Sequence, residues 1–154
     1  MGTRTIQNEL LAAMPRKAYD ALAPALAPVT LVFGEVLYKP GAPITQVYFP
    51  CESMVSLLVP VDQHFDVEVG MVGREGMVGA SLSLGIAQSP VKALVQGAGS
   101  ALRLSAARFR RELAGNPALQ RAVNGYIHAL MEQITQTAAC NRFHVVEARL
   151  ARWL

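Results

Sequence analysis

The residues best suited to chemistry lie in one glycine-rich segment, residues 71–91, which reads MVGREGMVGASLSLGIAQSPV. Glycines let a backbone approach a ligand closely, and consecutive backbone amides, here those of Gly79, Ala80 and Ser81, bind anions weakly. Only one acid and one base lie in the segment. This composition predicts a binding pocket with little charge. The alternative that the sequence leaves open is that the glycines only turn the chain and allow close strand packing.

Cysteines and single histidines offer little further chemistry. Cys51 and Cys140 are far apart and form no CxxC pair, so neither a disulfide framework nor a zinc site is predicted. The first 50 residues hold no cysteine that could bind an iron–sulfur cluster. Cys51, Glu52 and His64 are the candidate axial ligands for a haem, but His64 reads as a solvated loop residue and Cys51 as inert. We expect no metal, haem or iron–sulfur cofactor, and the effector is unknown.

An enzyme of the cupin type is the rival from another functional class. Such a site needs two histidines one residue apart on a strand, and His64, His128 and His144 do not supply them. Asp66 and Glu68 alternate along one predicted strand, which is typical of a solvated face. We therefore expect no enzyme, with a cupin-like metal enzyme as the less favoured alternative.

Composition limits the class of protein. The chain has 154 residues, 52% of them hydrophobic and only 16% charged, so we expect one core with some apolar surface covered by a partner. Its net charge of +3 is too weak to indicate nucleic-acid binding by this segment. No signal peptide or membrane-spanning run is recognisable, which predicts a cytoplasmic protein without a membrane partner.

Strand-like runs dominate the middle of the chain. Asn8 predicts the cap of a short helix, a second helix is expected over 15–26, and Ser105 predicts the cap of a third helix that ends at Leu113. Glycine and proline interrupt the sequence between them about every ten residues, which predicts an antiparallel barrel or jelly roll. The predicted strands cover 31–33, 36–38, 47–49, 55–59, 65–69, 92–96 and 100–104.

A long helix is predicted over 117–141. Its apolar positions recur with a near-heptad period, and Gly125, Ala138 and Ala139 would let another helix come close. This apolar seam packs either on the roll of the same chain or on a second copy of the chain. The helix is longer than one roll would cover, which favours a homodimer. The predicted interface comprises Leu119, Val123, Tyr126, Ile127, Leu130, Met131, Ile134, Thr137 and Ala138.

The order of these features resembles the sensor half of the Crp/Fnr family of bacterial transcription regulators. The residues that carry the resemblance are Gly34-Glu35-Val36-Leu37, Pro40-Gly41, Val47-Tyr48-Phe49-Pro50, Gly76-Met77-Val78-Gly79 and residues 146–154. The resemblance implies a sensor domain of the cyclic-nucleotide-binding type over 1–116 and a dimerisation helix over 117–141. Residues 142–154 then begin a truncated winged helix-turn-helix domain, through which the full-length protein would bind DNA.

The resemblance also predicts a departure from the family's ligand chemistry. In cyclic-nucleotide-binding members, the segment that matches residues 76–91, the cassette, contains a glycine followed by a Glu and, about ten residues later, an Arg. With Gly79 on that glycine, Ala80 replaces the Glu, and Ser89 or Pro90, followed by Val91, replaces the Arg. Both ionic contacts are lost, so we expect no standard cyclic AMP binding.

A different register would offer Glu75 as the ribose acceptor. In that register Glu75 lies farther from Ser89 than the family spacing allows, and no Arg stands at the expected position. The family's base-contacting positions on the long helix fall at Ile134 and Thr135, of which only Thr135 has a polar side chain. The candidate ligand contacts are therefore Gly79, Ala80, Ser81, Ser89, Pro90, Val91 and Thr135. A stand-alone dimeric ligand-binding or adaptor module remains the alternative function.

Overall fold

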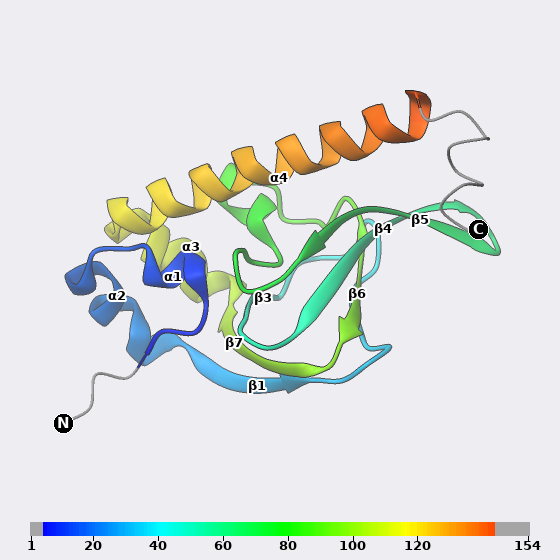
Figure 1. Cartoon of the computed structure of the whole chain (residues 1–154). Helices are drawn as coiled ribbons and strands as arrows, with labels where there is room; N and C mark the ends of the chain where they lie inside the picture. The colour runs from blue at the N-terminus through cyan, green and yellow to red at the C-terminus, as the bar shows by residue number, and fades with distance from the viewer. Residues whose placement is uncertain (1–4, 144–154) are drawn as a thin grey trace.

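The protein folds as a β-roll with a long helix along one side (Figure 1). The structure, a computed structural model, describes residues 5–143. The short α-helices gather at one end of the roll, and the long helix α4 (Pro117–Phe143) runs from there along the roll toward the hairpin of residues 54–72 (Figure 1). Among the described residues, no helix combines the length and apolar character needed to span a bilayer.

Two antiparallel sheets make up the roll. One has the strand order β1-β7-β3 and the other β2-β6-β4-β5. Such pairing between strands distant in sequence confirms the predicted antiparallel jelly roll followed by a long helix. The strands are β1 (Ala27–Leu31), β2 (Val36–Tyr38), β3 (Gln46–Pro50), β4 (Met54–Asp62), β5 (Phe65–Val72), β6 (Lys92–Gly97) and β7 (Gly99–Ser105).

The first strand differs from its prediction. The expected strand at 31–33 is wrong, because β1 ends at Leu31 and the next two residues, Val32 and Phe33, form a turn in which they are 62% and 69% exposed. The Val32 amide donates to the Glu35 carboxylate at 3.2 Å, and the Glu35 amide donates back to the Val32 carbonyl at 3.1 Å. An apolar run in an exposed turn looks the same as a strand when only residue types are known.

Side-chain caps fix two helices where the sequence predicts them. The Asn8 carboxamide accepts from the Leu11 amide at 3.1 Å, and the Ser105 hydroxyl accepts from the Arg108 amide at 3.2 Å. The helix expected over 15–26 is an α-helix followed by a 3-10 turn. The helices are α1 (Glu9–Ala12), α2 (Arg16–Leu22), η1 (Ala23–Ala25), η2 (Ala80–Leu84), α3 (Ala106–Gly115) and α4 (Pro117–Phe143).

Asn8 also ties the N-terminal helix to the glycine-rich segment. Its side chain is fully buried, and its Nδ2 donates to the carbonyl of Pro50 at 2.8 Å and to that of Gly76 at 2.9 Å. A buried amide that makes all these bonds loses little free energy, whereas an unpaired one costs about 1–3 kcal/mol. The side chain therefore holds α1, the end of β3 and the start of the cassette together.

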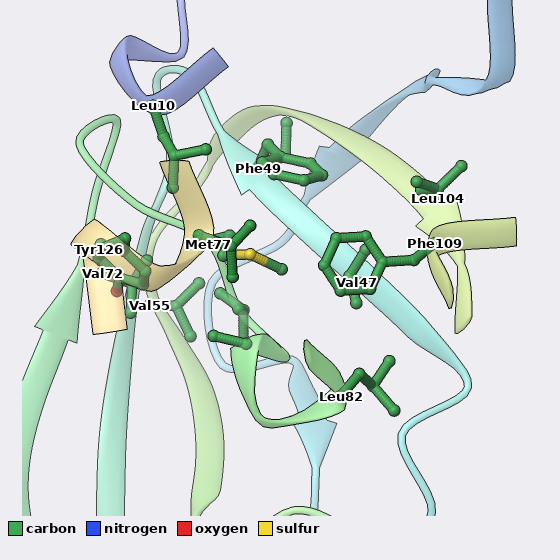
Figure 2. Close-up of a cluster of buried hydrophobic side chains, with 14 of the residues drawn as sticks. Leu10, Val47, Phe49, Val55, Val72, Met77, Leu82, Leu104, Phe109 and Tyr126 are labelled. Atoms are coloured by element: carbon green, nitrogen blue, oxygen red, sulfur yellow. The ribbon is translucent and has the colours of Figure 1, made fainter. Parts of the chain in front are cut away.

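The first half of α4 belongs to the core of the roll. Leu119 and Val123 are fully buried, and Tyr126 is 8% exposed. Figure 2 shows the cluster that they join, with side chains from Leu10 on α1 to Tyr126 on α4. For Leu119, Val123 and Tyr126, packing on the chain's own roll is what the structure shows, so these residues of the predicted dimer interface are already covered within one copy.

The second half of α4 is open. Ile127 and Leu130 are half-buried at the edge of the core, whereas Met131 is 61% and Ile134 36% exposed. Strands β4 and β5 continue alongside this half of the helix (Figure 1), and the Gln133 Oε1 accepts a hydrogen bond from the Met71 amide at 2.9 Å. The predicted start of a further domain at 142–154 lies outside the described residues, apart from the last residues of α4.

Two glycines provide a matched test of this packing. A Cβ on Gly76 would lie 2.6 Å from Oη of Tyr126 and closer still to its ring, whereas a Cβ on Gly125 meets nothing within 4 Å. Gly76→Ala should lower the free energy of unfolding by about 1–3 kcal/mol, the usual range for overpacking. Gly125→Ala should raise it by about 0.5–1 kcal/mol, because alanine suits a helix interior. Urea unfolding measures both, and equal effects of the two substitutions would contradict the contact.

Candidate ligand site

A cavity of about 140 Å³ lies where the glycine-rich segment, the second sheet and α4 meet. The glycine-rich residues predicted to contact a ligand all line it, whereas the predicted contact on the helix, Thr135, does not. The lining residues are Tyr38, Ile44, Leu57, Val69, Met77, Val78, Gly79, Ala80, Ser81, Ser89, Pro90, Val91, Leu130 and Ile134.

Backbone pairing with β3 positions the start of the cassette. Tyr48 and Val78 exchange hydrogen bonds, with N···O distances of 3.1 and 2.8 Å. Gly79 follows with φ of 101°, a left-handed conformation that favours glycine, and caps η2. A Cβ on Gly79 would also lie 2.9 Å from both Oη of Tyr38 and Cγ1 of Val47. Conformation and close packing therefore suffice to explain this glycine, as the alternative interpretation of the sequence proposed.

The turn at residues 40–44 holds the other end of the cassette. The Ser89 amide donates to the Ala42 carbonyl at 2.9 Å, and the Gly41 amide donates to the Ser89 carbonyl at 2.7 Å. The Ile44 amide donates to the Ala87 carbonyl at 2.8 Å. These bonds place Ser89, which is buried, at the cavity wall without any charged side chain.

The helix contributes Leu130 and Ile134 to the wall. An α-helix turns about 100° per residue, so Ile134 shares a face with Leu130, one turn earlier, while Thr135 points to a different side. Thr135 is exposed. Thr135 therefore does not line this cavity, because its apolar neighbour Ile134 occupies the position that faces the glycine-rich segment.

Several lining residues carry no recognisable signal in the sequence. Tyr38, Leu57 and Val69 come from β2, β4 and β5, where they read as ordinary strand residues. Only the alternation of inward and outward side chains could have placed them inside the roll. Which inward positions border a cavity rather than a neighbouring side chain depends on contacts that local pattern does not contain.

The side-chain hydroxyls of Tyr38 and Ser89 are hydrogen-bonded to the protein itself. The Tyr38 hydroxyl donates to the carbonyl of Gln46 and also lies 3.3 Å from that of Val78. Burial raises the pKa of Tyr38, so the phenol keeps its proton. The Ser89 hydroxyl donates to the Val91 carbonyl at 2.6 Å. The hydrogen-bond donors of both side chains are thus directed at backbone rather than at the space between the walls.

Two charged residues in or beside the glycine-rich segment, Glu75 and Lys92, are engaged elsewhere. The carboxylate of Glu75, the acceptor of the alternative register, accepts a hydrogen bond from the Gly73 amide at 3.0 Å, and Glu75 borders a different cavity of about 300 Å³. Lys92 forms an ion pair with Asp66, with a distance of 3.0 Å from Nζ to Oδ2. Neither Glu75 nor Lys92 lines the candidate site.

The candidate metal and haem ligands do not come together. Cys51 is buried, and burial, followed by the nearby Glu52 carboxylate, raises the pKa of its thiol. His64 lies in the β4–β5 turn, where its amide donates to the Asp62 carboxylate, and His128 pairs with Glu132 on α4. Within residues 5–143, no three side chains of His, Cys, Asp or Glu are grouped as a metal site.

Comparison with known proteins gives a clear result for the fold alone. Neither a family model nor a curated protein sequence matches the chain. Among solved structures, the c-di-GMP-responsive global regulator CLP of Xanthomonas campestris superposes with a TM-score of 0.75 at 17% identity, over 90% of this chain and 70% of CLP. A CooA mutant of Carboxydothermus hydrogenoformans gives 0.69 at 12% identity, over 99% of both chains.

A third solved structure, the catabolite activator protein of Thermus thermophilus, matches with a TM-score of 0.63 at 14% identity, over 86% of this chain and 60% of that protein. At these identities the likeness speaks for architecture and not for ligand. The resemblance predicted from the sequence is thereby confirmed in its fold: the chain adopts the β-roll of the cyclic-nucleotide-binding domains found in Crp/Fnr-type regulators.

Proposed function

We propose that this chain is the effector-sensing and dimerising part of a DNA-binding transcription regulator of the Crp/Fnr type. One observation carries the proposal: α4 forms a wall of the cavity through Leu130 and Ile134 and also exposes an apolar edge at Met131 and Ile134. A ligand in the cavity and a second copy on the helix would thus act on the same segment. The likeness to known regulators supports this assignment.

The cavity gives a ligand a way to act on the helix. An occupant that touches Ala80 or Val91 on the cassette side also touches Leu130 or Ile134 on the helix side. If its contacts differ between two positions of α4, it shifts the population toward the better-packed one. Sensing then requires no chemical reaction, which fits a regulatory protein and favours it over the cupin-like alternative.

The proposed dimer interface is narrower than the sequence suggested. Leu119, Val123 and Tyr126 pack on the roll, so the second copy would meet Ile127, Met131, Ile134, Thr137 and Ala138 along the open half of α4. Two such helices side by side would cover the exposed apolar stripe in a coiled-coil-like seam. DNA contact enters the proposal only by likeness to regulators and would reside outside residues 5–143.

The cassette should not recognise a cyclic nucleotide in the usual manner. The resemblance places Ala80 at the position of the family's carboxylate and Ser89 or Pro90 at that of the guanidinium, and no charged side chain lines the cavity. A phosphate taken out of water without a charged partner is strongly disfavoured, and the backbone amides of Gly79, Ala80 and Ser81 alone bind an anion only weakly. The c-di-GMP response of CLP is therefore not proposed for this pocket.

Titration calorimetry with cyclic AMP, cyclic GMP and c-di-GMP tests this directly. We expect dissociation constants weaker than roughly 100 µM, because losing charge-assisted bonds to a phosphate costs a few kcal/mol. The double variant Ala80→Glu, Pro90→Arg restores both groups and should bind cyclic AMP at least about tenfold more tightly than the wild type. Micromolar or tighter binding by the wild type would end this part of the proposal.

Light scattering at increasing concentration tests the dimer. Met131→Asp places a charge in the proposed seam and should weaken self-association by at least about a hundredfold, since a buried unpaired charge costs about 3–5 kcal/mol. Gln136→Asp is the control: it adds the same charge to the same half of α4 but lies about 140° around the helix. A wild type that stays monomeric at high concentration, or equal effects of the two variants, would contradict the interface.

A further inference from the structure

We propose that the cavity binds a small neutral ligand with an apolar body, of the size of one aromatic ring or a short hydrocarbon chain. This deepens the proposed sensor function by naming the class of its effector. Three properties of the site carry it: the charge of the walls, the engagement of their polar groups, and the volume that they enclose.

The walls carry no charge. Every side chain that lines the cavity is aliphatic, a methionine, a tyrosine, a serine, a proline or glycine. Lys92 pairs with Asp66 and Glu75 borders the other cavity, so neither offers a ligand an ionic partner. A charged ligand would lose its hydration here without gaining an ionic partner, whereas an apolar one gains from leaving water.

The polar side chains leave a ligand few hydrogen bonds. Tyr38 and Ser89 each have a single hydroxyl proton, and both protons are directed at backbone carbonyls. Ser81 adds one more hydroxyl at the wall. A ligand with one hydroxyl or carbonyl group can be accommodated by a Ser81 contact or by a free lone pair of Tyr38. A sugar with several hydroxyls cannot, because its groups would be buried without partners.

The volume matches a compact ligand. The cavity of about 140 Å³ is bordered by Ile44, Leu57, Val69 and Ile134 among others. An engineered cavity of about 150 Å³ lined by Leu, Ile and Phe in another protein binds benzene or xenon. Well-buried ligands of this size, with about six to nine heavy atoms, reach dissociation constants in roughly the 10 µM to 1 mM range.

A pair of probes with the same ring isolates the role of charge. Methyl-selective NMR of the chain, titrated with toluene and separately with benzoate, reports on Leu57, Val69, Leu130 and Ile134. We expect toluene to shift these methyl signals with a dissociation constant at least about tenfold lower than that of benzoate. Benzoate binding as tight as toluene, or toluene shifts confined to other parts of the protein, would overturn the proposal.

A second experiment tests the location of the site by filling the cavity with a larger side chain. Ala80→Leu places a larger side chain in the wall and should weaken toluene binding at least about tenfold, while Ala87→Leu, an exposed cassette residue outside the cavity, should leave it unchanged. Ile134→Trp, at a position 36% exposed, offers the same test from the helix without overpacking the roll. Undiminished toluene binding in a folded Ala80→Leu or Ile134→Trp variant would show that the site lies elsewhere and contradict the inference.

The outcome separates this inference from the sensor proposal. If the chain dimerises through α4 but toluene does not bind, the ligand class is wrong and the proposed regulator stands. If toluene binds in the cavity but the chain stays monomeric, the ligand class stands and the dimeric regulator is wrong. Tight binding of a cyclic nucleotide in place of toluene would overturn the neutral effector alone.

Discussion

The contact between Tyr126 and Gly76 determines where α4 crosses the roll, and the candidate site follows from it. The Tyr126 ring occupies the space that any side chain at residue 76 would need. Its hydroxyl lies near the Met77 amide but, among the described residues, makes no hydrogen bond of ordinary geometry. That burial is unfavourable for the hydroxyl, so the packing of the ring must outweigh it. With Tyr126 fixed, Leu130 and Ile134 come one and two turns later on the same face, which places them at the cavity.

The same constraint divides α4 into two halves with different roles. Leu119, Val123 and Tyr126 are covered by the roll, whereas Met131 and Ile134, farther along the helix, are 61% and 36% exposed. Leu130 lies at the boundary, half-buried and in the cavity wall. A ligand that changes the packing at Leu130 would therefore act between Tyr126, which is held in the core, and Gln133, whose Oε1 accepts from the Met71 amide at 2.9 Å.

Local chemistry was predictable from the sequence, and contacts between distant segments were not. Asn8 and Ser105 were recognisable caps, because a cap depends on a side chain and the amide three residues later. The absence of charge at Ala80 and Pro90 was equally visible, since it concerns residue types alone. The seam on α4 was visible but its partner was not: periodicity shows that a face is apolar without showing what covers it. The same limit explains the choice of Thr135 over Ile134 and the strand expected through Val32 and Phe33.

A neutral cavity limits how strongly its occupant can act on the helix. An ionic ligand can couple two segments through a strong contact to each, whereas an apolar ligand couples them only through differences in packing. Allosteric coupling free energies are typically about 1–3 kcal/mol, which corresponds to roughly 5–150-fold in affinity. Burying one ring against both the cassette and Ile134 supplies a free energy of that order at about 25 cal/mol per Å². A switch of that strength needs no charged side chain in the cavity wall, and it would act through the contacts that Leu130 and Ile134 of α4 make with the cavity.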